Sequence, residues 1–215
     1  MKKQTIKEFT EGEINRVTAT MMSIDWSNPA AYGDFLAQTY YHICHSTRLL
    51  AAAAARFPLH QEKFHLQCMR HSEEERSHEK LSLSDLKEIG YRLEEFSELP
   101  GTKSLYRSNY FLIEHVSPLA LFGYAYFLEW IAIAGGEKLM AATEPVYGSR
   151  AVKHMHVHTK EDPEHLKAYE GLLEEFSGKD REVLIEAIAT TAADYERIYL
   201  EIDARAASKK QKRAA

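Results

Sequence analysis

Helix-breaking residues divide this chain into long segments, and their spacing constrains the fold more than any other feature. Pro29, Pro58, Gly90, Pro100 and Gly178 separate stretches whose apolar residues recur with a helical period, and almost no stretch alternates as a strand does. A chain of 215 residues, of which 45% are hydrophobic, is long enough to bury a sizeable core. The pattern therefore predicts an all-α protein, a bundle of about seven to eight helices.

Capping residues give approximate bounds for these helices. Asn28-Pro29 and Asp162-Pro163 each combine an N-cap with a proline at the first helical position. The predicted helices cover residues 5–22, 29–57, 60–89 with a bend near Ser82, 102–115, 117–143 softened at Gly135-Gly136, 150 onward, 163–178 and 180–206. No repeat or linker separates them, so we predict one domain over residues 1–207 and a solvated basic tail over residues 208–215.

The longest apolar run, Val116 to Gly136, has one charged residue, Glu129. Its length would allow a membrane span, but amphipathic helices flank it on both sides, which favours a buried central helix. The net charge of -5 argues against nucleic acid or an anionic membrane as a partner. No apolar stretch follows Met1 as in a signal peptide, and the two cysteines show no C-x-x-C spacing. We therefore expect a cytoplasmic protein without a disulfide framework.

Two motifs place acidic and histidine side chains on one helix face. Glu75 and His78 are three residues apart, so both side chains can reach the same point, although an exposed charged helix would show this pattern too. Asp162 and His165 repeat this spacing of three residues between an acid and a histidine, and His158 adds a second histidine four residues before Asp162. Asp162 is also the expected N-cap before Pro163, a role that leaves one carboxylate oxygen free.

Glu129 is the third element, because a buried carboxylate without a partner costs several kcal/mol. A metal ion would compensate the charge, and so would a buried arginine or histidine. Together the patterns offer three carboxylates and three imidazoles without a thiolate, a set that suits iron or manganese. Di-iron sites in helix bundles are built from inward glutamates and Glu-x-x-His pairs. The ferritin-like version fails here, since residues 29–57 contain no glutamate and Asp34 is their only acid.

These residues resemble a different family, the haem-oxygenase-like non-haem di-iron oxidases and oxygenases. The resemblance extends from about Tyr32 to Phe176. It includes the segment His71-Ser-Glu-Glu-Glu-Arg-Ser-His78 and the stretch Asp85-Leu-Lys-Glu-Ile-Gly90. Ser77 stands where the family usually has glycine. Some members have a glutamate at the position of His71, so the resemblance makes Glu75 the ligand here. It implies six metal ligands: Glu75, His78, Glu129, His158, Asp162 and His165.

The resemblance also implies a function. Two Fe(II) ions, or manganese in their place, would react with O2 and oxidise a small organic acid or amine, with Glu129 as the catalytic residue that bridges or flanks the metals. The fold is shared with thiaminase II and haem oxygenase. No haem is expected, because residues 5–22 contain no histidine. For Tyr124 and Tyr126, near Glu129, we expect core packing. The sequence is compatible with a homodimer.

Two alternatives stay open. One is a thiaminase-II-like hydrolase on the same fold, with Cys44 or Cys68 as nucleophile; His42 and His45 lie close to Cys44 in sequence. The other is a non-catalytic haem-oxygenase-like binding protein. Loss of activity on chelation would favour the di-iron reading, and loss on thiol alkylation alone would favour the hydrolase.

Overall fold

A computed structural model describes residues 4–173 and 175–214, with side chains except those of residues 161–165 and 209–214. All regular structure in these ranges is helical, which confirms the predicted all-α class. The α-helices are α1 (Ile6–Met22), α2 (Pro29–Ile43), α3 (Ser46–Ala54), α4 (Glu62–Glu74), α5 (Glu79–Glu88), α6 (Pro100–Phe111), α7 (Ala120–Ala134), α8 (Gly136–Tyr147), α9 (Lys153–Leu173) and α10 (Gly178–Ala214). Short 3-10 turns at Leu59–Gln61, Leu93–Glu95 and Ser149–Ala151 and a π-helical turn at Leu112–Val116 lie between them.

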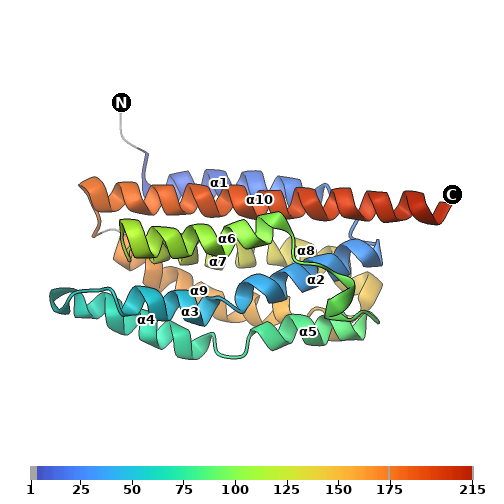
Figure 1. The fold of residues 1–215 in the computed structure, drawn as a ribbon, viewed down its shortest axis with the longest axis horizontal. Helices are drawn as coiled ribbons and strands as arrows, with labels where there is room; N and C mark the ends of the chain where they lie inside the picture. Colours follow the sequence, from blue (N-terminus) through green and yellow to red (C-terminus); the bar gives the residue numbers. More distant parts are fainter. Residues whose placement is uncertain (1–3, 174, 215) are drawn as a thin grey trace.

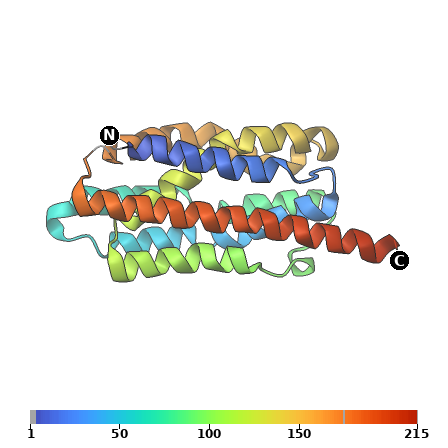
Figure 2. The same ribbon diagram turned by 90° about the horizontal axis from the view of Figure 1, so that it is seen from above.

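The helices run mainly along the long axis of the molecule (Figure 1). Helix α10 extends along the whole bundle beside α1, and α4 and α5 lie on the opposite side (Figures 1 and 2). Helix α10 packs against α1, α2, α6 and α7, and α7 also packs against α9. Helix α7 is therefore central, and its neighbours bury it on several sides.

The burial of α7 confirms the prediction of a buried central helix. Most of its residues are buried, including Glu129, which is 6% exposed. At Gly123 a β-carbon would lie 2.6 Å from the carbonyl oxygen of Leu184, so the missing side chain allows α7 and α10 to approach closely. No helix in the described ranges is both long and apolar enough to cross a membrane.

Several predicted helix bounds are wrong in an informative way. Two long predicted helices are each divided, at Cys44-His45 and at Glu75–His78, so the bend expected near Ser82 lies earlier in the chain. The softening predicted at Gly135-Gly136 is confirmed, because α7 ends and α8 begins there. Conversely, α9 is continuous from Lys153 to Leu173, so Asp162-Pro163 does not begin a helix. Helix α10 continues beyond the expected end near Ala206 to Ala214. The Asn28 cap is confirmed, because its side-chain oxygen accepts from the Ala30 backbone N–H at 3.0 Å.

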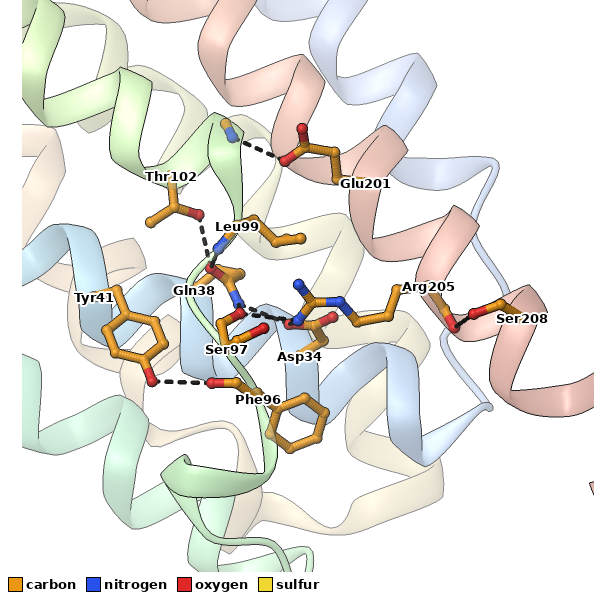
Figure 3. Close-up of polar contacts among 11 residues, drawn as sticks. Asp34, Gln38, Tyr41, Phe96, Ser97, Leu99, Thr102, Glu201, Arg205 and Ser208 are labelled. Carbon is orange, nitrogen blue, oxygen red and sulfur yellow. Dashed lines mark hydrogen bonds and ion pairs between the residues drawn. The ribbon is translucent and has the colours of Figure 1, made fainter. Parts of the chain in front are cut away.

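A buried polar network joins α2, the segment before α6, and α10 (Figure 3). Asp34 of α2 accepts from Arg205 of α10 at 3.2 Å and from Gln38 at 2.7 Å. The Gln38 side-chain oxygen in turn accepts from the Leu99 backbone N–H at 2.9 Å and the Thr102 hydroxyl at 2.8 Å. The one acid of α2 therefore stabilises the packing of α10, which agrees with its exclusion as a metal ligand.

Candidate metal centre

Glu75 and His78 lie on the turn between α4 and α5, and not on one continuous helix. Ser77 between them has a φ of 77°, in the left-handed region that favours glycine. This conformation gives a physical reason for the glycine usual at this position in the family that the motif resembles. The Glu75 Oε1 and His78 Nδ1 atoms are nevertheless 3.6 Å apart, so the two side chains converge as predicted, through a turn instead of a helix face.

His71 of α4 completes a buried cluster that the sequence analysis did not assign. Its Nε2 atom lies 3.0 Å from Glu129 Oε1 of α7 and 3.5 Å from Glu75 Oε1. Its Nδ1 atom is hydrogen-bonded to the hydroxyl of Tyr169 on α9 at 2.5 Å. All four side chains are at least nine-tenths buried. The spacing of four residues between His71 and Glu75 is a signal that predicts this contact, whereas the family resemblance assigns only Glu75 as a ligand.

Two overlapping groups of side chains could each hold a metal ion. In Glu75, His78 and His158, one ligand atom from each residue lies within 4.8 Å of the others, and the same holds for His71, Glu75 and Glu129. Glu75 belongs to both groups, so its two oxygens could contact two ions. The oxygen and nitrogen ligands, without a thiolate, match the donor set that suits iron.

The protonation of this cluster shows how its charge is balanced without a metal. Burial lowers the pKa of His71, but hydrogen bonds with Glu129 and Glu75 outweigh it and raise this pKa to about 10. Burial raises the pKa of Glu75, and hydrogen bonds from His71 and His78 outweigh that effect, so the pKa of this carboxyl lies well below its ordinary value. A protonated His71 therefore stands between two carboxylates in the place where a cation would be favourable.

Helix α9 contributes His158, whose ring lies at right angles to that of His78, with the ring centroids 5.2 Å apart. The start of α9 is held by Asp85 of α5, which is fully buried and accepts from the backbone N–H of His154 at 2.8 Å. Asp85 thus caps the helix that carries His158 and gives the Asp85–Gly90 stretch of the resemblance a structural role. The side chains of Asp162 and His165, further along α9, lie outside the described residues.

A cavity of about 80 Å³ opens beside the cluster. The metal-ligand candidates on its wall are His71, Glu75, Glu129 and His158. Its other lining residues are Ile43, Ser46, Leu50, Leu121, Ala125, Leu128 and Ala132, together with His42, Tyr124, His154 and Tyr195. Tyr124 therefore faces the cavity, whereas the Tyr126 hydroxyl contacts Glu170 at 3.4 Å. Apolar walls next to a polar cluster are typical of a site that binds a small molecule.

The two cysteines do not have the surroundings of a nucleophile. Neither thiol lines the cavity. Burial raises the pKa of Cys44, and it raises the pKa of the fully buried Cys68 to about 12. Both thiols thus stay protonated at neutral pH, whereas a nucleophilic cysteine needs a lowered pKa. The structure offers no support for the cysteine hydrolase.

Comparisons with known proteins agree with this architecture. Residues 33–196 match the model of a family described as iron-containing redox enzymes. A domain of unknown function with a haem-oxygenase-like fold from Shewanella denitrificans OS217 is 19% identical, with 93% of this chain and 92% of that chain covered and a TM-score of 0.80. A TenA homolog from Pseudomonas syringae pv. tomato str. DC3000 is 11% identical, with 91% of each chain covered and a TM-score of 0.73. These two likenesses show a haem-oxygenase-like fold. No curated protein sequence matches the chain.

Proposed function

This chain belongs to the family of iron-containing redox enzymes, and on that basis we propose that it binds two iron ions between α4, α7 and α9 and uses them with O2 to oxidise a small organic acid or amine. The observation that carries the proposal is the position of Glu75, which belongs to both groups of candidate ligand atoms. A carboxylate shared by two ions is a recurrent feature of di-iron sites in helix bundles. Asp162 and His165 remain proposed ligands on the spacing of the motif.

The protein's own residues would prepare the site in three ways. The proton that His71 holds between Glu75 and Glu129 must leave when a metal binds at its Nε2 atom, so the histidine exchanges one positive charge for another. The Tyr169 hydroxyl orients the His71 ring through Nδ1. The apolar walls formed by Leu50, Leu121 and Leu128 limit the access of water. Two ferrous ions would supply the electrons for O2 reduction that these side chains cannot supply.

Iron stoichiometry provides the first test. The protein is loaded anaerobically with Fe(II), desalted, and its iron content per chain is measured by plasma mass spectrometry. We expect two ions in the unmodified protein, fewer than one in Glu75→Ala, because both sites lose a ligand, and about one in Glu129→Ala. The control is His60→Ala, which removes an exposed histidine outside the cavity and should leave two ions.

Oxygen reactivity provides the second test. Exposure of the Fe(II)-loaded protein to O2 should give a transient visible absorption, and Glu75→Ala should lose it. Unchanged iron content in both glutamate variants would refute the assignment of the ligands. Activity that survives chelation and disappears on thiol alkylation would refute the iron-dependent function.

A further inference from the structure

Among the polar side chains of the cavity that belong to neither group of metal-ligand atoms, three share an unusual feature. They are His42 of α2, Tyr124 of α7 and His154 of α9. The His42 and Tyr124 side chains are 5% and 3% exposed. The Nδ1 atoms of both histidines and the hydroxyl oxygen of Tyr124 are buried and have no hydrogen-bond partner in the part of the chain that the structure describes.

Three such groups at one cavity are unusual, because buried polar atoms are nearly always hydrogen-bonded. Leaving a polar group buried without a partner costs free energy that the fold must offset. Since all three residues line the cavity, a molecule inside it can supply the partners. They come from three helices, so packing of the whole bundle is needed to assemble them.

The charge of the surroundings restricts what this molecule carries at that position. No lysine or arginine is among the cavity residues that the structure describes. Burial lowers the pKa of His42 to about 3, so this ring is neutral. An ionic group of either sign would lose its hydration there, and neither His42 nor Tyr124 would offer it an opposite charge. A hydroxyl or amide avoids this cost and can both donate and accept.

The size of the cavity and its other walls restrict the rest of the molecule. A volume of about 80 Å³ is far below the roughly 300 Å³ at which sites for drug-sized ligands begin. The aliphatic side chains of Ile43, Leu50, Leu121 and Leu128 belong to the remaining wall. They favour a short hydrocarbon chain.

We propose that the substrate is a short aliphatic molecule that carries, besides the group oxidised at the metal site, an uncharged hydroxyl or amide group, and that His42, Tyr124 and His154 bind this second group. The inference rests on the proposed function, because it assigns the acid or amine end to the irons. It adds the chemistry of the other end, which the metal site by itself does not determine.

Four molecules with the same four-carbon chain test the proposal: 4-hydroxybutyrate, butyrate, succinate and 4-aminobutyrate. Each is titrated by calorimetry into anaerobic Fe(II)-loaded protein of known iron content and, separately, into metal-free protein. We expect 4-hydroxybutyrate to bind the loaded protein about tenfold more tightly than butyrate, the effect of roughly one satisfied hydrogen bond. Succinate and 4-aminobutyrate should bind more weakly than 4-hydroxybutyrate.

Three variants locate the preference. Tyr124→Phe and His42→Leu should each reduce the advantage of 4-hydroxybutyrate over butyrate at least threefold. Tyr126→Phe removes a hydroxyl from the same helix outside this cavity, so it should keep the full advantage. Thermal unfolding by circular dichroism shows that each variant is folded.

The proposal is overturned if the unmodified protein binds 4-hydroxybutyrate no more tightly than butyrate. It is also overturned if Tyr124→Phe and His42→Leu both keep the full preference for 4-hydroxybutyrate. Equal or tighter binding of succinate or 4-aminobutyrate would overturn the requirement for an uncharged group. The iron content separates the two hypotheses. A protein that binds no iron contradicts the proposed function, and the titrations of the metal-free protein then still decide whether these three residues recognise a hydroxyl group.

Discussion

Replacement of Asp85 tests whether a carboxylate on α5 holds the start of the ligand-bearing helix α9. In Asp85→Ala the backbone N–H of His154 loses the oxygen that accepts from it at 2.8 Å. Loss of an N-cap costs about 0.5–2 kcal/mol, and a buried N–H without a partner costs about 1–3 kcal/mol. The two figures describe largely the same loss, so we expect a decrease of about 2 kcal/mol in the free energy of unfolding.

The matched variant is Asp85→Asn, whose amide oxygen can still accept from His154. We expect it to lose less than about 1 kcal/mol at pH 7. For a chain of this length, 1 kcal/mol shifts the melting temperature by about 2–4 °C. Asp85→Ala should therefore melt about 4–8 °C below the unmodified protein. Hydrogen exchange should also show faster exchange of the His154 amide in Asp85→Ala, but not in Asp85→Asn.

The pH dependence gives an independent check on Asp85. Burial is the main cause that raises its pKa from 3.8 to about 6 in the folded protein. A raised carboxyl pKa means that the folded state favours the protonated form. The contribution of protonated Asp85 to the free energy of unfolding is therefore complete below pH 3.8 and is lost as the pH rises through 6. Asparagine does not titrate, so the stability of Asp85→Asn relative to the unmodified protein should increase between pH 4 and pH 7. Equal melting temperatures for the alanine and asparagine variants, at every pH, would refute the capping role.

Three further predictions concern the metal site and its supports. Tyr169→Phe removes the hydroxyl bonded to His71 Nδ1, so it should lower iron affinity about 10–100-fold, as measured by competition with a chelator. An unchanged affinity would show that this contact does not orient the His71 ring. Ser77→Gly should raise the free energy of unfolding by about 0.5–1 kcal/mol in urea titrations, because it relieves a left-handed conformation, and a loss of stability would contradict the strain. Iron loading should slow hydrogen exchange in α9 more than in α7, because residues 152–165 include four histidines and few apolar residues that could pack into the core. Equal protection of both helices in the metal-free protein would show that packing alone orders α9.

Local sequence signals were sufficient for much of the fold. Helical periodicity and the positions of proline and glycine predicted the all-α class, and one charge in an apolar run predicted that α7 is central with Glu129 buried. These signals act within a few residues, so they survive in almost any packing of the helices. They failed at Asp162-Pro163, where α9 continues through a strong start signal.

The candidate site shows the same division. The sequence itself brought Glu75, His78, Glu129 and His158 together as candidates, because ligand-type residues at helical spacing or in apolar surroundings stand out along the chain. Only the tertiary structure decided that His71 lies between Glu75 and Glu129, and that Asp85 caps α9. It also decided that His42, Tyr124 and His154 face one cavity. These contacts join residues that are far apart in the chain, and they depend on which helix faces meet, a property that no local spacing encodes.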